Sequence, residues 1–135
     1  MAISDTSIIL DSSVWIAFFK QDDSQHQKAE GVLAQAPSAQ VVVPEYVLVE
    51  VATALKQRGY QTAAKEFVAM VMHEGRSIFL PSDALARETS TCFCERSDKL
   101  SFTDTALLTL SREYRIITFD KALARAIVAE QRKLR

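Results

Sequence analysis

The amino-acid sequence predicts a single α/β domain, residues 1–135, built as a three-layer α/β/α sandwich around a short, mainly parallel sheet. Three observations lead to this prediction. Short apolar segments alternate with longer amphipathic ones, only three Gly and three Pro interrupt the chain, and no repeat or low-complexity linker divides it. A chain of 135 residues that is 48% hydrophobic can also bury a core of its own.

The predicted strands are short and rich in β-branched or other apolar residues. They cover residues 7–10, 40–43, 77–80 and 115–118. Because helical segments separate them, each strand is expected to run parallel to its neighbour, with helices on both faces of the sheet.

The predicted helices cover residues 12–19, 24–35, 44–58, 62–74, 82–95, 102–113 and 121–131. Pro44 suits the first position of its helix, where a missing N–H costs nothing. Gly59 ends that helix, and Ser101 is a natural N-cap for the helix that begins at Phe102. Residues 96–100 are polar and are predicted to form a loop.

Composition excludes several classes of protein. A net charge of -1 and a pI near 6.1 offer phosphate no general attraction, so any contact with nucleic acid must be local. Cys92 and Cys94 form one isolated C-x-C, which fits neither a disulfide framework nor a four-ligand zinc site, and favours the reducing cytoplasm. No apolar run approaches the roughly 18 residues of a membrane span, and no secretion signal is recognisable.

Four acidic residues occupy positions that suit a binding site. Asp11 follows the first predicted strand and Asp120 follows the fourth, and ligands of parallel sheets bind beyond these carboxyl ends. Asp104 lies in the first turn of an otherwise apolar helix. Glu50 lies on the flank of the apolar stripe of its own helix.

Each acid also has a structural interpretation. Asp11 and Asp120 could be N-caps, Asp104 could complete a Ser-x-x-Asp box with Ser101, and Glu50 could be a solvated helix residue. Together, however, four carboxylates that converge repel one another unless a cation neutralises them. Because all the ligands would be oxygens, the cation predicted is Mg²⁺ or Mn²⁺.

Four segments carry a resemblance to a known family. They read IILDSS at residues 8–13, PEYVLVEV at 44–51, LSFTDTAL at 100–107 and ITFDKAL at 117–123. In this order they resemble the PIN domain, and within it the VapC toxins of type II toxin–antitoxin modules. The resemblance spans nearly the whole chain.

The resemblance implies a PIN-like sandwich and a metal-dependent endoribonuclease. The family's acidic tetrad falls on Asp11, Glu50, Asp104 and Asp120, which would hold Mg²⁺ or Mn²⁺, with Asp98 as the alternative to the last acid. Its hydroxyl positions fall on Ser12 or Ser13 and on Thr118. The implied partners are an RNA substrate, a cognate antitoxin protein and a second copy of the chain in a homodimer.

Two other functions compete with this one. A catalytically degenerate PIN-like module would bind RNA or protein without cutting it, but would not need all four acids. A magnesium-binding phospho-acceptor domain would need an acidic pair at the end of the first strand, where Asp11 is followed instead by two serines.

Surface roles are assigned from the sequence as follows. Four cations beside the acids are candidates to guide RNA, although solvated helix and loop ends explain them equally well: Arg96, Lys99, Lys121 and Arg125. Val49 and the aromatic residues 15–19 are expected to form partner surfaces. His26 and His73 are expected at the surface, and Met70 and Met72 in the core.

Overall fold

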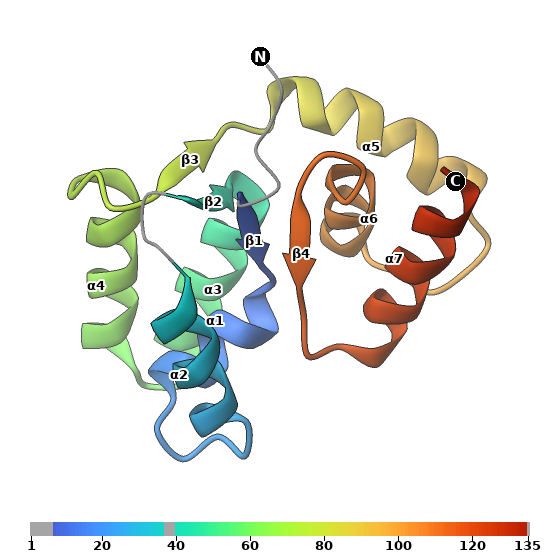
Figure 1. The fold of residues 1–135 in the computed structure, drawn as a ribbon. Coiled ribbons are helices and arrows are strands. Elements are labelled where there is room, and N and C mark those ends of the chain that lie inside the picture. The colour runs from blue at the N-terminus through green and yellow to red at the C-terminus, as the bar shows by residue number, and fades with distance from the viewer. Residues whose placement is uncertain (1–6, 37–39, 135) are drawn as a thin grey trace.

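The computed structural model describes residues 7–36 and 40–134 and confirms the α/β fold, with four strands and seven helices in these residues (Figure 1). The strands are β1 Ile8–Leu10, β2 Val41–Pro44, β3 Ile78–Leu80 and β4 Arg115–Ile117. The helices are α1 Ser12–Phe19, α2 His26–Gln35, α3 Glu45–Gln57, α4 Gln61–Met72, α5 Asp83–Glu95, α6 Phe102–Leu110 and α7 Lys121–Lys133.

The sheet has the strand order β3-β2-β1-β4, and every neighbouring pair is parallel. Ile9 of β1 pairs with Val42 of β2 on one side and with Ile116 of β4 on the other. The chain therefore steps outward from β1 to β3 and then returns to the opposite side of β1. This reversal between β1 and β4 is a topological switch point, where parallel sheets leave a crevice at the carboxyl ends of their strands.

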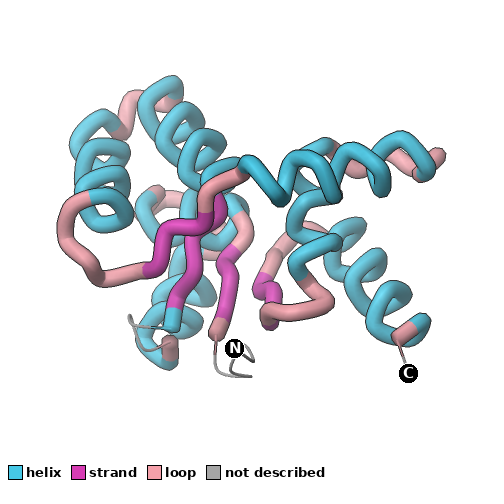
Figure 2. The backbone as a smooth tube through the Cα atoms, turned by 90° about the horizontal axis from the view of Figure 1, so that it is seen from above, coloured by secondary structure: helices cyan, strands magenta, loops and turns pink. Residues whose placement is uncertain are grey.

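The helices form two groups beside this sheet. In Figure 1, α1 to α4 gather around β1, β2 and β3, whereas α6 and α7 lie beyond β4 and α5 crosses above. Figure 2 shows the strands between these two groups. Within the groups, α3 packs on α4, α1 on α2 and α3, and α6 on α5 and α7. The switch point thus lies between the two groups of helices.

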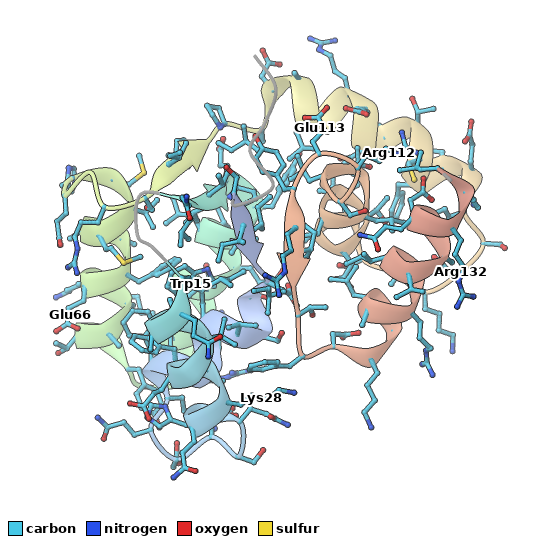
Figure 3. All side chains as sticks on the ribbon, in the orientation of Figure 1. Trp15, Lys28, Glu66, Arg112, Glu113 and Arg132 are labelled. Atoms are coloured by element: carbon cyan, nitrogen blue, oxygen red, sulfur yellow. The ribbon has the colours of Figure 1, made fainter. Side chains whose placement is uncertain are left out.

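The core corrects one prediction about the aromatic residues. Trp15, labelled in Figure 3, is only 2% exposed. Between ring centroids, it lies 5.0 Å from Phe67 on α4 and 6.5 Å from Phe19. The expectation that Trp15 forms a partner surface is therefore wrong. Its large apolar ring is buried because α4 covers that face of α1.

The expected burial of two further residues, Met72 and His26, also changes. Met72 is 46% exposed, because it lies in the last turn of α4, so it is not a core residue as predicted. His26 is partly buried, and its Nδ1 lies 2.8 Å from the carbonyl oxygen of Ala17, which ties α2 to α1. His73 is exposed, as expected.

Some helix limits differ from the prediction for local reasons. Pro44 is the last residue of β2 and the N-cap of α3 rather than its first helical residue, because its backbone is extended (φ -65°, ψ 148°). α2 begins at His26, after a turn in which Asp23 accepts a hydrogen bond from the Gln25 N–H. α6 ends at Leu110, whose carbonyl then accepts from two later N–H groups in a tight turn. None of the described helices is long and apolar enough to cross a membrane.

Candidate active site at the switch point

A cavity of about 600 Å³ opens at the carboxyl ends of β1 and β4. All four acids singled out in the sequence line it: Asp11, Glu50, Asp104 and Asp120. They come from the β1–α1 junction, α3, the first turn of α6 and the β4–α7 junction. The fold thus brings together side chains that are up to 109 positions apart, from Asp11 to Asp120.

Asp11 is buried, with 3% of its surface exposed, and both of its carboxylate oxygens are held. Oδ1 accepts from the Ser12 N–H at 2.7 Å, so Asp11 is also the N-cap of α1. Oδ2 accepts from the Ser13 hydroxyl at 2.9 Å and the Thr118 hydroxyl at 2.7 Å. Asp11 can therefore be both the N-cap of α1 and a residue of the site. The polar donors around it stabilise its buried charge.

The same hydroxyls connect Asp11 to other parts of the cavity. Ser12 donates a short hydrogen bond from Oγ to Glu50 Oε1, which joins α1 to α3. Ser13 Oγ accepts from the Phe119 N–H at 3.1 Å. The bond between Phe119 and Ser13, together with that from Thr118 to Asp11, fastens the end of β4 to the end of β1.

Asp104 lies in the electric field of the other acids. Its N–H donates to Ser101 Oγ at 3.0 Å, which is the predicted helix cap. Burial raises the pKa of the Asp104 carboxyl above its ordinary value, and the negative charges of Asp11 and Asp120 raise it further, while the hydrogen bonds from Ser101 act in the opposite direction. Repulsion between converging carboxylates is thus already present in this arrangement.

The structure separates the two candidates for the last acid. Asp120 lines the cavity and caps α7, its Oδ1 accepting from the Leu123 N–H at 2.9 Å. Asp98 does not line the cavity and is engaged by the guanidinium of Arg96, which lowers the pKa of the Asp98 carboxyl. Asp120, rather than Asp98, lies beside the other three acids.

The cations expected to guide RNA do not reach this cavity. None of the four lines it, and Arg96 is instead held by Asp98. The cation that does line it is Arg58, directly after α3, which sequence reasoning missed. The sequence offers only a weak sign of this position. Arg58 follows Glu50 by eight residues, which places the two side chains about 80° apart around a helix at 100° per residue, on neighbouring but not identical faces.

The donor set fits a hard divalent cation, since every acidic ligand offers oxygen. Within residues 7–36 and 40–134, however, no three Asp, Glu, His or Cys side chains lie close enough together to form a ready-made metal site. Mutual repulsion keeps carboxylates apart, and the oxygens of Asp11 are turned to hydroxyl and amide donors. Closing these side chains around an ion requires rotations within the cavity.

The strand order and the acidic cavity define the class: an α/β protein with a carboxylate site at the switch point of a parallel sheet. The family model of the PIN domain matches residues 8–128, and the chain belongs to this family. It is similar in structure to the Mycobacterium tuberculosis toxin VapC20, described as cleaving the sarcin–ricin loop. The TM-score is 0.79 at 22% identity, over 89% of this chain and 95% of that one. No curated protein is significantly similar in sequence.

Proposed function

We propose that the protein is a Mg²⁺- or Mn²⁺-dependent endoribonuclease and the toxin of a toxin–antitoxin pair. The observation that carries this proposal is the convergence of four carboxylates on one cavity at the switch point of the sheet. Membership of the PIN domain family supports it, as does the likeness in fold to a toxin described as cleaving an RNA loop.

The four acids would share the work of holding metal. Asp11 and Asp104 would hold the main ion, and Glu50 and Asp120 would hold a second ion or position water. When bound, divalent ions neutralise charge on the phosphoryl oxygens and make water a better nucleophile at neutral pH. No histidine is needed as a base in this scheme.

The hydroxyl groups would fix the carboxylates before substrate arrives. Ser13 and Thr118 hold one oxygen of Asp11, so that the carboxylate cannot rotate freely. Ser12 donates its backbone N–H to Asp11 and its hydroxyl to Glu50, which couples the orientation of one acid to that of the other. Preorganisation of this kind is how outer-shell groups sustain the affinity and activity of metal sites.

Cleavage of single-stranded RNA tests the proposal. The purified parent should cut RNA with Mg²⁺ or Mn²⁺ present, should stop in excess chelator, and should recover when metal is restored. Asp11→Asn, purified in parallel, is the control for contaminating ribonuclease, and it should lose several orders of magnitude in rate. Cleavage that persists in chelator only with the parent would exclude metal dependence, and RNA binding without cleavage would favour the degenerate binding module.

The partners proposed are an antitoxin and a second copy of the chain. Val49 on α3 is 58% exposed and lines a second cavity of about 600 Å³ beside Tyr46, so the outer face of α3 offers apolar surface for a homodimer. The antitoxin would present an Arg or Lys to the carboxylates. The cytoplasm is the proposed location, and free Cys92 and Cys94 fit it.

Two measurements test these partners. Light scattering should give a dimer for the parent and a monomer for Val49→Asp, whereas equal masses would exclude this face. The product of a small neighbouring gene, co-expressed with the parent, should co-purify and relieve growth inhibition. If neither happens, the toxin assignment fails even where the nuclease assignment stands.

A further inference from the structure

Arg58 is held at a fixed place beside the acidic cavity. It is the C-cap of α3 and is followed by Gly59 in the left-handed region, with φ +88°. The Gly59 N–H donates to the Lys56 carbonyl at 3.2 Å, and the Tyr60 N–H donates to the Leu55 carbonyl at 2.8 Å. This pair of bonds is a Schellman motif, which fixes the backbone where the helix ends.

A side-chain hydrogen bond joins two segments next to this cavity. Tyr60 Oη donates to Asp22 Oδ1 at 2.9 Å, which links the end of α3 to the turn between α1 and α2. Residues 23–25 of that turn line the same cavity as Arg58 and the four acids. The segment that follows Arg58 is therefore tied to the turn whose residues 23–25 line the cavity.

The guanidinium of Arg58 itself is uncommitted. Its residue is exposed, and no ion pair to it forms within residues 7–36 and 40–134. A neighbouring cation, Lys28, lies over the ring of Phe119 at 4.9 Å from its centroid (Figure 3). Among the described residues that line the cavity, Arg58 is the one Lys or Arg beside five carboxylates, the fifth being that of Asp23.

An RNA strand entering this cavity meets mostly negative charge. Divalent ions on the four acids would offset that charge at the bond to be cut, but not along the strand beyond it. Arginine binds phosphate through paired, charge-assisted N–H donors, which makes it the natural contact for a neighbouring phosphate. Arg58 follows Glu50 by eight residues, which is about 12 Å along the axis of α3 at 1.5 Å per residue.

We propose, resting on the proposed RNA cleavage, that Arg58 binds a phosphate of the RNA that flanks the scissile one. Its separation from Glu50 along α3 places it further along the strand than the acids. The alternative is that Arg58 is a solvated residue that merely complements the helix dipole at the end of α3. The two roles differ in their effect on substrate binding.

Steady-state cleavage of a short single-stranded RNA distinguishes them. Arg58→Ala should raise KM about tenfold and leave kcat within about twofold, because the contact is made equally in the ground and transition states. Arg58→Lys should fall between Arg58→Ala and the parent. The matched control is Lys56→Ala, two residues earlier, which lines a different cavity of about 440 Å³ between α3 and α4 and should leave KM unchanged.

Salt dependence and direct binding provide independent readouts. The affinity of fluorescent RNA for the cleavage-deficient Asp11→Asn protein should fall with salt, and adding Arg58→Ala should reduce the logarithmic slope by about 0.7, the value of one phosphate contact on a single strand. An unchanged KM and slope in Arg58→Ala, or equal effects in Lys56→Ala, would overturn the assignment of Arg58. A parent that cuts no RNA would overturn the proposed function instead, and the slope would still decide whether Arg58 contacts phosphate.

Discussion

Thr118 Oγ1 donates a hydrogen bond of 2.7 Å to Asp11 Oδ2 and accepts one of 3.0 Å from the Asp120 N–H. One hydroxyl thus sets the position of a buried acid directly after β1 and of the backbone that carries a second acid after β4. At the switch point these side-chain bonds add to a backbone bond of 2.9 Å from the Asp11 N–H to the Ile117 carbonyl. Thr118 is therefore expected to act on both acids at once.

Thr118→Val removes both hydrogen bonds and keeps the shape of the side chain. We expect the cleavage rate or the affinity for Mg²⁺ to fall about 10- to 100-fold, as for other groups that orient metal ligands. Unfolding free energy should fall by about 1 kcal/mol, since the hydroxyl is replaced by methyl next to a buried carboxylate. Thr118→Ser keeps the donor and should retain most of the activity. Activity retained in Thr118→Val and lost in Thr118→Ser would show that the methyl, not the hydroxyl, matters.

Asp104→Asn should stabilise the protein in the absence of divalent ions. The raised pKa of the Asp104 carboxyl means that its ionised form is unfavourable in the folded state. The gain should be about 1 kcal/mol or less, because water screens a half-buried carboxylate. This gain in stability should be fully present above the folded-state pKa of Asp104 and should disappear as pH falls below the ordinary pKa of 3.8. Thermal melts of the parent and the variant at a series of pH values measure it.

Magnesium should reverse the order of these stabilities. Millimolar Mg²⁺ should raise the Tm of the parent, whereas Asp104→Asn and Asp11→Asn should lose most of that rise because they bind the ion weakly. Asp98→Asn is the matched control, since Asp98 is held by Arg96 away from the cavity and should leave the response to Mg²⁺ unchanged. The same response in all four proteins would mean that the acids act as independent helix caps.

Two glycine substitutions should have opposite effects. Gly59→Ala forces an L side chain to φ +88° and should cost about 1 kcal/mol of unfolding free energy, although nothing crowds its Cβ. Because the strain falls beside Arg58, RNA binding should weaken as well. Gly31→Ala, inside α2 with open space around its Cβ, should instead stabilise by about 0.5–1 kcal/mol and leave RNA binding unchanged. Chemical denaturation and the fluorescent-RNA titration measure both effects.

Glu130 and Arg112 provide a test of stability that is separate from the cavity. Arg112 donates from Nε and Nη2 to Glu130 Oε1, at 3.2 and 2.9 Å, and thereby joins the end of α6 to α7. Glu130→Ala should lower the unfolding free energy by about 2 kcal/mol, less than for a fully buried pair because Arg112 is partly exposed. Cleavage by the folded variant should be unchanged, and a large loss of kcat at a temperature where it stays folded would contradict this separation.

The sequence predicted the fold and the four acids for reasons that are local. A carboxylate directly after a short apolar segment, as at Asp11 and Asp120, must lie at the carboxyl end of a strand if that segment is one, and parallel strands bring such ends together. Asp104 stands out because it is an acid in the first turn of an otherwise apolar helix. These inferences need only the direction of the chain and the spacing of its apolar residues.

The features that were missed depend on contacts between distant segments. The aromatic residues around Trp15 have the same spacing in the sequence whether a partner or α4 covers their face of the helix. Only the packing of Phe67 against Trp15 shows that this residue belongs to the core. Arg58 is the last residue of its predicted helix, and its place in the cavity depends on how α3 approaches the turn after α1. The cations nearest to the acids in sequence, such as Lys121, were favoured for proximity along the chain, but such proximity does not make a side chain line the cavity, and Lys121 does not line it.

The hydrogen bond between Thr118 and Asp11 also determines when, during synthesis of the chain, the site can first form. The two residues are 107 positions apart, and ribosomes add roughly 5–20 residues per second, so about 5–20 s pass between their synthesis. Until β4 leaves the ribosome and docks on β1, Asp11 lacks the hydroxyl of Thr118 and the site lacks Asp120. A growing chain therefore cannot yet assemble the four-acid cavity, and the proposed nuclease activity would begin only after this interval.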